Sequence, residues 1–237
     1  MVEHTIRAFD ADLQELGRKI ANMGRLDDEQ IAAAIEALVK RDEALAARVL
    51  AADDRIDDLQ DDIEGKVIAT IARRQPMAVD LREIVGALRI ANDLERVGDL
   101  AENIAKRVPM LIEEVHIDEA VLQLQRMAQL VREQLTRVLW SYARRDVAKA
   151  MEVWHRDQDV DAMNTSLFRE LLTYMMESPR NITFCTHLIF CAKNLERIGD
   201  HATNIAESVA YIVEGQPVAL ERPKADFITR AAVQPIA

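Results

Sequence analysis

The sequence is poor in the residues that interrupt helices or cross-link chains. Its 237 residues include only 7 glycines, 6 prolines and 2 cysteines, and aromatic side chains make up 4%. Sheet proteins with frequent tight turns need more glycine and proline, so the composition favours long helices. Cys185 and Cys191 lie six positions apart on one predicted helix, too far from each other to form a disulfide. We therefore expect an all-α protein from a reducing compartment.

A basic block and a long apolar run are also missing. The formal net charge is -11 at pH 7, which is unlike the electrostatic footprint of a nucleic-acid-binding protein. No apolar stretch reaches the length of a membrane-spanning helix, and the first residues, from Met1 to His4, do not resemble a secretory signal. We expect a cytoplasmic protein that neither binds nucleic acid nor inserts into a membrane.

The chain repeats itself. The segment LERVGDLAENIA, which begins at Leu94, returns 101 residues later from Leu195 as LERIGDHATNIA. Upstream, the segment DDRID from Asp53 matches DQDVD from Asp157, 104 residues later. Self-similarity at a fixed offset is the sequence signature of a repeated structural unit. We interpret the molecule as a duplication.

Each copy reads as three amphipathic helices, because apolar residues recur at spacings of three and four. Short connections make sequential helices antiparallel neighbours. The prediction is two tandem up-down-up three-helix bundles with six long helices, related by internal duplication. The first bundle spans residues 1–110, the second spans 111–215, and 216–237 is an extended or disordered tail. The predicted breaks lie near Arg41, Pro76, Pro109, Arg145, Pro179 and Gly215.

Acidic residues occur at matched positions on neighbouring predicted helices. Glu95 and Asp99 are four residues apart and share one helix face. Counting outward from Pro76 places Asp57 level with Glu95, and Asp53 level with Asp99. If these faces meet, each copy forms a four-carboxylate patch that suits multivalent, oxygen-preferring cations. The predicted metal-binding residues are Asp53, Asp57, Glu95 and Asp99 in the first copy and Asp157, Asp161, Glu196 and Asp200 in the second.

Other interpretations of the acidic motif stay open. A solvated acidic stripe balanced by nearby arginines is the simpler alternative. Gly98 and Gly199 lie in mid-helix, where each costs about 1 kcal/mol relative to alanine, and a tight packing seam accounts for them better than approach to an ion. The first copy has Glu102 where the second has Thr203, so we expect the first to be richer in carboxylates.

Catalytic motifs are not evident. The glycines are too sparse for a phosphate-binding loop, and there is no Gly-x-Ser-x-Gly segment. We expect no nucleotide cofactor and no enzymatic activity. The alternatives are a metal-dependent helix-bundle enzyme or metal store, and a scaffold without metal.

The two Leu-Glu-Arg-(Val/Ile)-Gly-Asp-x-Ala-x-Asn-Ile-Ala segments, each after an Asp-x-x-(Ile/Val)-Asp helix, resemble the PhoU family of bacterial phosphate-transport accessory proteins. The resemblance covers about residues 5 to 214. It implies two three-helix bundles in one chain, a homodimer, and multinuclear iron or zinc clusters on the Glu-x-x-x-Asp faces.

The resemblance also implies a function. PhoU proteins are cytoplasmic adaptors between the ATPase subunit of the phosphate ABC transporter and the phosphate-sensing histidine kinase. They act as negative regulators of the phosphate-starvation genes when phosphate is plentiful. Residue patterns alone do not lead to this role, although an acidic helical surface without catalytic motifs suits an adaptor.

Overall fold

The computed structural model describes residues 2–114 and 117–218, which form six long α-helices and no β-strand. This confirms the predicted all-α class and the six long helices. Most of the predicted tail, residues 219–237, lies outside the described residues. The helices are α1 (Val2–Lys40), α2 (Glu43–Arg74), α3 (Val79–Ala105), α4 (Asp118–Arg144), α5 (Val147–Glu177) and α6 (Ile182–Glu214), with short 3-10 helices η1 (Val108–Leu111) and η2 (Pro179–Asn181).

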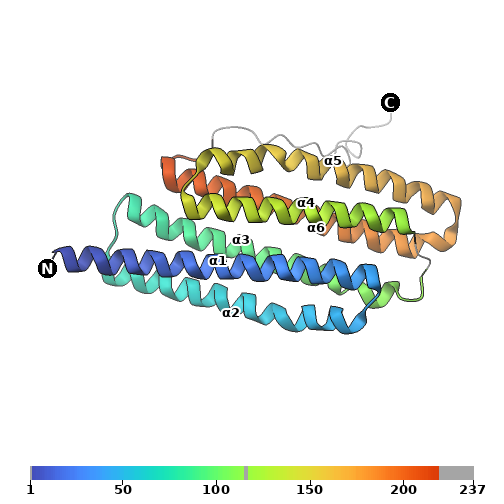
Figure 1. Ribbon diagram of the computed structural model, residues 1–237, viewed down its shortest axis with the longest axis horizontal. Helices are drawn as coiled ribbons and strands as arrows, with labels where there is room; N and C mark the ends of the chain where they lie inside the picture. Colours follow the sequence, from blue (N-terminus) through green and yellow to red (C-terminus); the bar gives the residue numbers. More distant parts are fainter. Residues whose placement is uncertain (1, 115–116, 219–237) are drawn as a thin grey trace, which may run out of the picture.

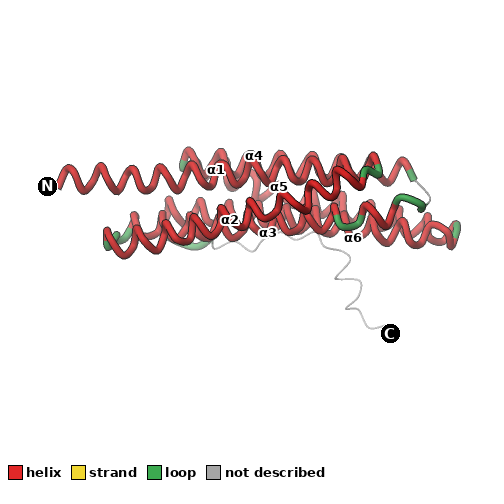
Figure 2. The backbone as a smooth tube through the Cα atoms, turned by 90° about the horizontal axis from the view of Figure 1, so that it is seen from below, coloured by secondary structure: helices red, strands yellow, loops and turns green. Residues whose placement is uncertain are grey.

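The helices form two up-down-up bundles that lie side by side in an elongated molecule (Figure 1). Bundle one is α1 to α3 and bundle two is α4 to α6. Figure 2 shows α1 and α4 together in one layer and the other four long helices in a second layer. The α2–α3 and α5–α6 connections lie at opposite ends of the molecule (Figure 1).

The turn between the first two helices is built the same way in both bundles. Arg41 and Arg145 adopt positive φ angles of 53° and 56°, which end α1 and α4 in the left-handed conformation. The next residues, Asp42 and Asp146, cap the following helices. Asp42 Oδ1 accepts a hydrogen bond from the Leu45 amide at 2.9 Å, and Asp146 Oδ1 accepts one from Lys149 at 3.0 Å. The repeated Arg-Asp pair thus specifies both reversals.

The two bundles meet along α3 and α6. At Gly86 of α3, an added Cβ would lie 2.4 Å from both Cδ1 and Cγ1 of Ile212, so only glycine lets the helices approach this closely. Farther along, Asp93 Oδ1 contacts His201 Nδ1 at 2.9 Å and accepts a hydrogen bond from Asn204 Nδ2 at 3.2 Å. Close packing and polar contacts both hold the bundles together.

A second contact between the bundles joins α1 to α4. The Arg132 guanidinium binds the Asp28 carboxylate in a bidentate arrangement, with Nε–Oδ1 and Nη2–Oδ2 distances of 2.7 and 2.8 Å. The two residues are 104 positions apart, which is the offset of the repeat. They therefore occupy the same position in the two copies, with opposite charges.

Exchanging these charges tests the contact. We expect Asp28→Arg to destabilise the protein by about 1 kcal/mol, because it faces two guanidinium groups toward each other at a partly exposed site. Adding Arg132→Asp should restore the thermal unfolding midpoint, since the pair is rebuilt in the opposite direction. A double variant that unfolds below both single variants would contradict this account.

Candidate functional site

The four predicted acidic residues of bundle one lie close together on α2 and α3. Asp53 Oδ1 lies 3.2 Å from the point where a Cβ on Gly98 would stand, so α2 and α3 turn these faces toward each other. Burial is the main cause that raises the pKa of Asp53, and the negative charges of Glu102, Asp57 and Asp99 raise it further. Counting residues predicted the matching heights, and the structure adds the rotation of the helices.

The clustered carboxylates of bundle one are destabilised in their charged form. Burial, followed by repulsion from neighbouring carboxylates, raises the pKa values of Asp57 and Glu95 above their ordinary values. Arg96 offsets part of the charge: its Nη1 donates to Asp99 Oδ2 at 2.9 Å, and its Nε lies 3.3 Å from Glu95 Oε2. The face retains a surplus of negative charge that a cation would reduce.

Bundle two holds its predicted acidic residues deeper. Asp157, Asp161 and Glu196 are only 2%, 5% and 6% exposed, whereas Asp57 in bundle one is exposed. Glu196 Oε2 forms an ion pair with Lys193 Nζ at 2.7 Å. The two copies therefore share the acidic motif but differ in its depth and in the basic residue beside it.

Gly98 of α3 and Gly199 of α6 each allow an aspartate of the neighbouring helix to approach closely. A Cβ on Gly199 would stand 2.9 Å from Asp157 Oδ1 and 3.4 Å from Gln134 Oε1, much as a Cβ on Gly98 would crowd Asp53. A close packing seam explains both glycines, as the sequence indicated. At Gly199 the nearest neighbour is the Asp157 carboxylate, whereas at Gly98 it is Ile56 Cδ1 at 3.0 Å, with Asp53 Oδ1 just beyond it at 3.2 Å, so an acidic group lies in both seams.

The depth of Glu196 predicts a pH dependence of stability. Burial is the main reason why its pKa is raised above the ordinary glutamate value of 4.5, and Lys193 only partly opposes the effect. Glu196 therefore ionises at a lower pH in the unfolded state than in the folded state. As the pH rises from about 4.5 through the folded pKa, the contribution of Glu196 to the free energy of unfolding falls. We expect the thermal midpoint of Glu196→Gln to rise relative to wild type across this window. Parallel midpoints between pH 4 and 7 would contradict the prediction.

The predicted faces offer only oxygen donors, which suit hard cations better than thiolate-preferring metals. Within residues 2–114 and 117–218, no group of three or more His, Cys, Asp or Glu side chains is arranged to hold a metal ion. The buried Asp27 carboxyl of α1 lies outside these predicted faces, and neither of its oxygens has a hydrogen-bond partner among the described residues.

Asp27 is a buried acidic residue that the sequence analysis did not single out. It lies on the core-facing stripe of α1 between Met23 and Ile31, all three being 0% exposed. The signal was an acidic residue at a position where the 3-4 spacing calls for an apolar one. Comparison of the repeats would also have found it, because the equivalent residue, 104 positions later, is Val131.

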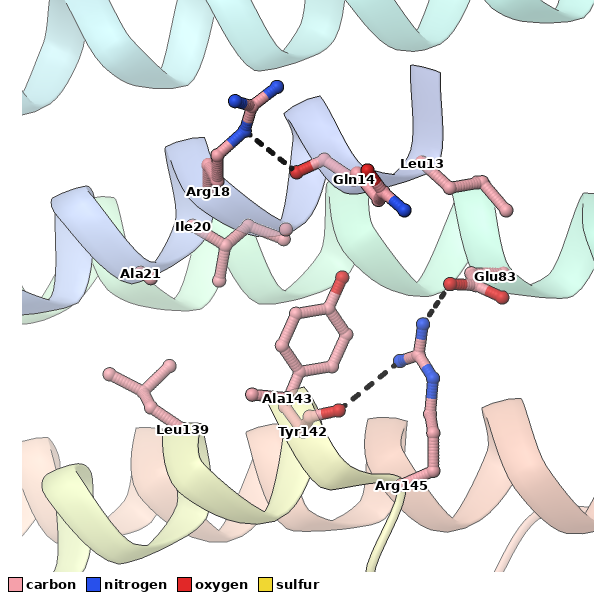
Figure 3. A pocket seen from close by; sticks show the side chains of 11 residues that line it. Leu13, Gln14, Arg18, Ile20, Ala21, Glu83, Leu139, Tyr142, Ala143 and Arg145 are labelled. Atoms are coloured by element: carbon pink, nitrogen blue, oxygen red, sulfur yellow. Dashed lines mark hydrogen bonds and ion pairs between the residues drawn. The ribbon is translucent and has the colours of Figure 1, made fainter. Parts of the chain in front are cut away.

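A groove of about 500 Å³ lies where bundle one meets α4 (Figure 3). Its lining includes Leu13, Ile20 and Leu139, and Arg145 binds Glu83 of α3 across it. Burial raises the pKa of Tyr142, another lining residue, to about 12. None of the predicted carboxylates lines the groove, so it is separate from the acidic faces.

None of the helices in the described ranges combines the length and apolar character that a membrane crossing requires.

Comparison with known proteins yields one family. The model of the PhoU domain matches residues 20–108 and 124–209. The chain is 53% identical over 224 residues to the phosphate-specific transport system accessory protein PhoU homolog of Rhizobium meliloti, covering 94% of each chain. It is 46% identical over 230 residues to the Caulobacter vibrioides homolog, covering 97% of this chain and 100% of the relative.

A solved structure shows the same fold. The crystal structure of PhoU from Pseudomonas aeruginosa superposes with a TM-score of 0.84 at 38% sequence identity. The match covers 88% of this chain and 100% of that chain. Both bundles therefore have counterparts in the solved structure.

Proposed function

Because this chain belongs to the PhoU family, we propose that it is a non-enzymatic accessory protein that regulates phosphate transport. The observation that carries the proposal is similarity along nearly the whole chain to phosphate-specific transport system accessory proteins, at up to 53% identity among those described above. Its two bundles superpose on those of a solved PhoU structure.

In this proposal, the protein is a cytoplasmic adaptor between two partners. One is the ATPase subunit of the phosphate ABC transporter, and the other is the phosphate-sensing histidine kinase. When phosphate is plentiful, the adaptor couples them and keeps the kinase from activating the phosphate-starvation genes. A net charge of -11 and a long helical surface support recognition of other proteins through charge complementarity.

We assign metal binding to the acidic faces. Asp53, Asp57, Glu95 and Asp99 would hold a cation between α2 and α3, and Asp157, Asp161, Glu196 and Asp200 would do so between α5 and α6. Bound iron or zinc would neutralise the clustered carboxylates and tie the two helices together. Burial, and after it repulsion from neighbouring carboxylates, raises the pKa values of Asp53, Glu95 and Glu196, and a bound cation would favour the ionised form against both effects, which supports this assignment. A homodimer completes the proposed assembly.

Deleting the gene in the native host tests the regulatory role. We expect phosphate-scavenging genes to be expressed strongly in phosphate-rich medium, and the full-length chain supplied in trans to restore repression. Co-purification at high and low phosphate should recover the transporter ATPase or the kinase. Unchanged expression after deletion would count against the proposal.

A metal-dependent helix-bundle enzyme or metal store is the alternative function, since clustered carboxylates also occur in such proteins. Elemental analysis and an activity screen of the purified protein separate the two: turnover at a metal site favours the enzyme, and partner capture favours the regulator. The double variant Glu95→Ala with Asp99→Ala then asks whether signalling needs the metal. Signalling and metal content both unchanged in this variant would support a scaffold without metal at this face.

A further inference from the structure

The groove of about 500 Å³ between bundle one and α4 runs along α1 (Figure 3). Its lining follows this helix from Leu13 to Ala21, a rise of about 12 Å. Leu139 of α4 contributes apolar surface from the other side, and a Cβ on Gly17 would meet no atom within 4 Å. The groove is therefore elongated, has apolar walls and is open at Gly17.

The repeat shows that small side chains make this space. Helices α1 and α4 are antiparallel, because Gly24 faces Leu139 and Asp28 binds Arg132. The counterpart of the groove therefore lies where the start of α4 meets the end of α1. With the offset of 104 residues, Gly17, Ala21 and Ala143 correspond to Val121, Gln125 and Val39. The two copies have diverged toward smaller residues at the end of the α1–α4 contact that holds the groove.

Tyr142 brings a hydroxyl group into the groove. Its side chain extends from α4 toward α1 in Figure 3, and the residue is only 5% exposed. Among the described residues, the hydroxyl has no hydrogen-bond partner, and the nearest charge is the Arg145 guanidinium, whose Cζ lies 4.8 Å from the centre of the ring. The equivalent residue of α1 is Leu38, which is 2% exposed, so packing does not require a hydroxyl here. A nearly buried hydroxyl that finds no acceptor in this part of the protein is available to a ligand in the groove.

The polar groups around the groove favour an anion. Arg145 pairs with Glu83 across the groove. Arg18, another lining residue, is exposed and forms no ion pair with a described carboxylate, so positive charge is in excess here although the whole chain is acidic. Burial raises the pKa of Tyr142 to about 12, so its hydroxyl stays protonated at neutral pH and can donate a hydrogen bond. Elongated apolar walls with one free donor and excess positive charge match an apolar chain that ends in an anionic group.

We propose that this groove binds an aliphatic carboxylate, a molecule of the fatty-acid type, between the two bundles. The chain lies along α1, between Leu13 and Leu139 and over Gly17. The carboxylate accepts a hydrogen bond from the Tyr142 hydroxyl, beside the Arg145 guanidinium. Because α1 and α3 of bundle one and α4 of bundle two all line the groove, the bound molecule contacts both bundles and stabilises their association. The site is separate from the acidic faces and does not depend on the regulatory role proposed above.

Calorimetric titration of the full-length protein with sodium decanoate tests the site. We expect saturable binding of one equivalent, and an affinity at least tenfold weaker for 1-decanol, which has the same chain without the charge. Tyr142→Phe keeps the ring and removes the donor, so it should also weaken decanoate binding at least tenfold. Equal affinities of the wild-type protein for decanoate and 1-decanol would overturn the assignment of a carboxylate.

Filling the groove gives a second test. Gly17→Val introduces the residue that α4 carries at the equivalent position, and its added atoms enter the open space at this glycine. Because no atom lies within 4 Å of the added Cβ, the variant should fold, and circular dichroism verifies its helix content. We expect Gly17→Val to abolish decanoate binding.

The matched control is Gly65→Val. It makes the same change at a glycine of α2 that is equally open and does not line the groove, so it should bind decanoate like wild type. Decanoate should raise the thermal unfolding midpoint of Gly65→Val but not that of Gly17→Val. Equal decanoate affinities in these two variants, or no saturable binding to the wild-type protein, would overturn the proposal.

Discussion

Replacing Trp154 with alanine is expected to lower the free energy of unfolding by about 3–5 kcal/mol. The side chain is 2% exposed and is among the largest buried side chains of the described residues. Its Nε1 donates a hydrogen bond to Glu207 Oε1 at 2.9 Å, which joins α5 to α6. Truncation therefore opens a cavity in bundle two and removes this bond. Chemical denaturation monitored by circular dichroism measures the loss.

Two further variants separate the contributions of Trp154. Trp154→Phe keeps an aromatic ring in the core and removes the N–H donor, so it should lose less stability than alanine. Leu50→Ala changes the equivalent, partly buried position of bundle one and should cost less than Trp154→Ala. A loss below about 1 kcal/mol for Trp154→Ala would show that the core of bundle two closes around the missing ring.

Gly86→Leu is expected to be comparably damaging, at about 3 kcal/mol, through overpacking. Even a single added carbon at Gly86 would stand 2.4 Å from two atoms of Ile212, which is only 3% exposed and stiff at its branched Cβ. The backbone hydrogen bonds lie within each helix, so the helical circular dichroism signal should persist at low temperature. The variant should lose the close contact between α3 and α6, detected as a lower unfolding midpoint and a less cooperative transition.

Relieving the clash provides the control. In Gly86→Ala with Ile212→Ala, the added methyl group occupies space that the truncated isoleucine vacates. The double variant should lose less stability than the sum of the two single variants, because the two positions are in contact. Additive losses would mean that Gly86 and Ile212 do not limit each other in solution.

The helices and their reversals could be predicted from the sequence because their signals are local. Apolar spacing marks each helix, and the Arg-Asp pairs at 41–42 and 145–146 mark two of the turns that the structure contains. Counting from Pro76 also predicted which carboxylates share a height, since the rise per residue of a helix is fixed. Local rules therefore determined the elements and their approximate register.

Other features could not be derived from local rules. The Asp28–Arg132 contact depends on how two separate bundles pack, which no spacing within one bundle specifies. Asp27 was missed for a different reason: its acidic side chain suggested a surface position, although the apolar spacing of α1 and the equivalent Val131 both place it on the core-facing stripe. Metal binding at the acidic faces stays a prediction, because the clustered negative charge favours it while no three His, Cys, Asp or Glu side chains of the described residues are arranged to hold an ion.

The ion pair between equivalent positions also restricts how the halves of the chain associate. If two separate copies of either half assembled in the arrangement that the bundles adopt here, Asp28 would face a second Asp28, or Arg132 a second Arg132. Both pairings place like charges in contact, whereas the covalently joined halves attract each other. Linking the halves in one polypeptide allowed them to diverge into complementary partners, so an ancestral assembly of identical halves could not have had this contact.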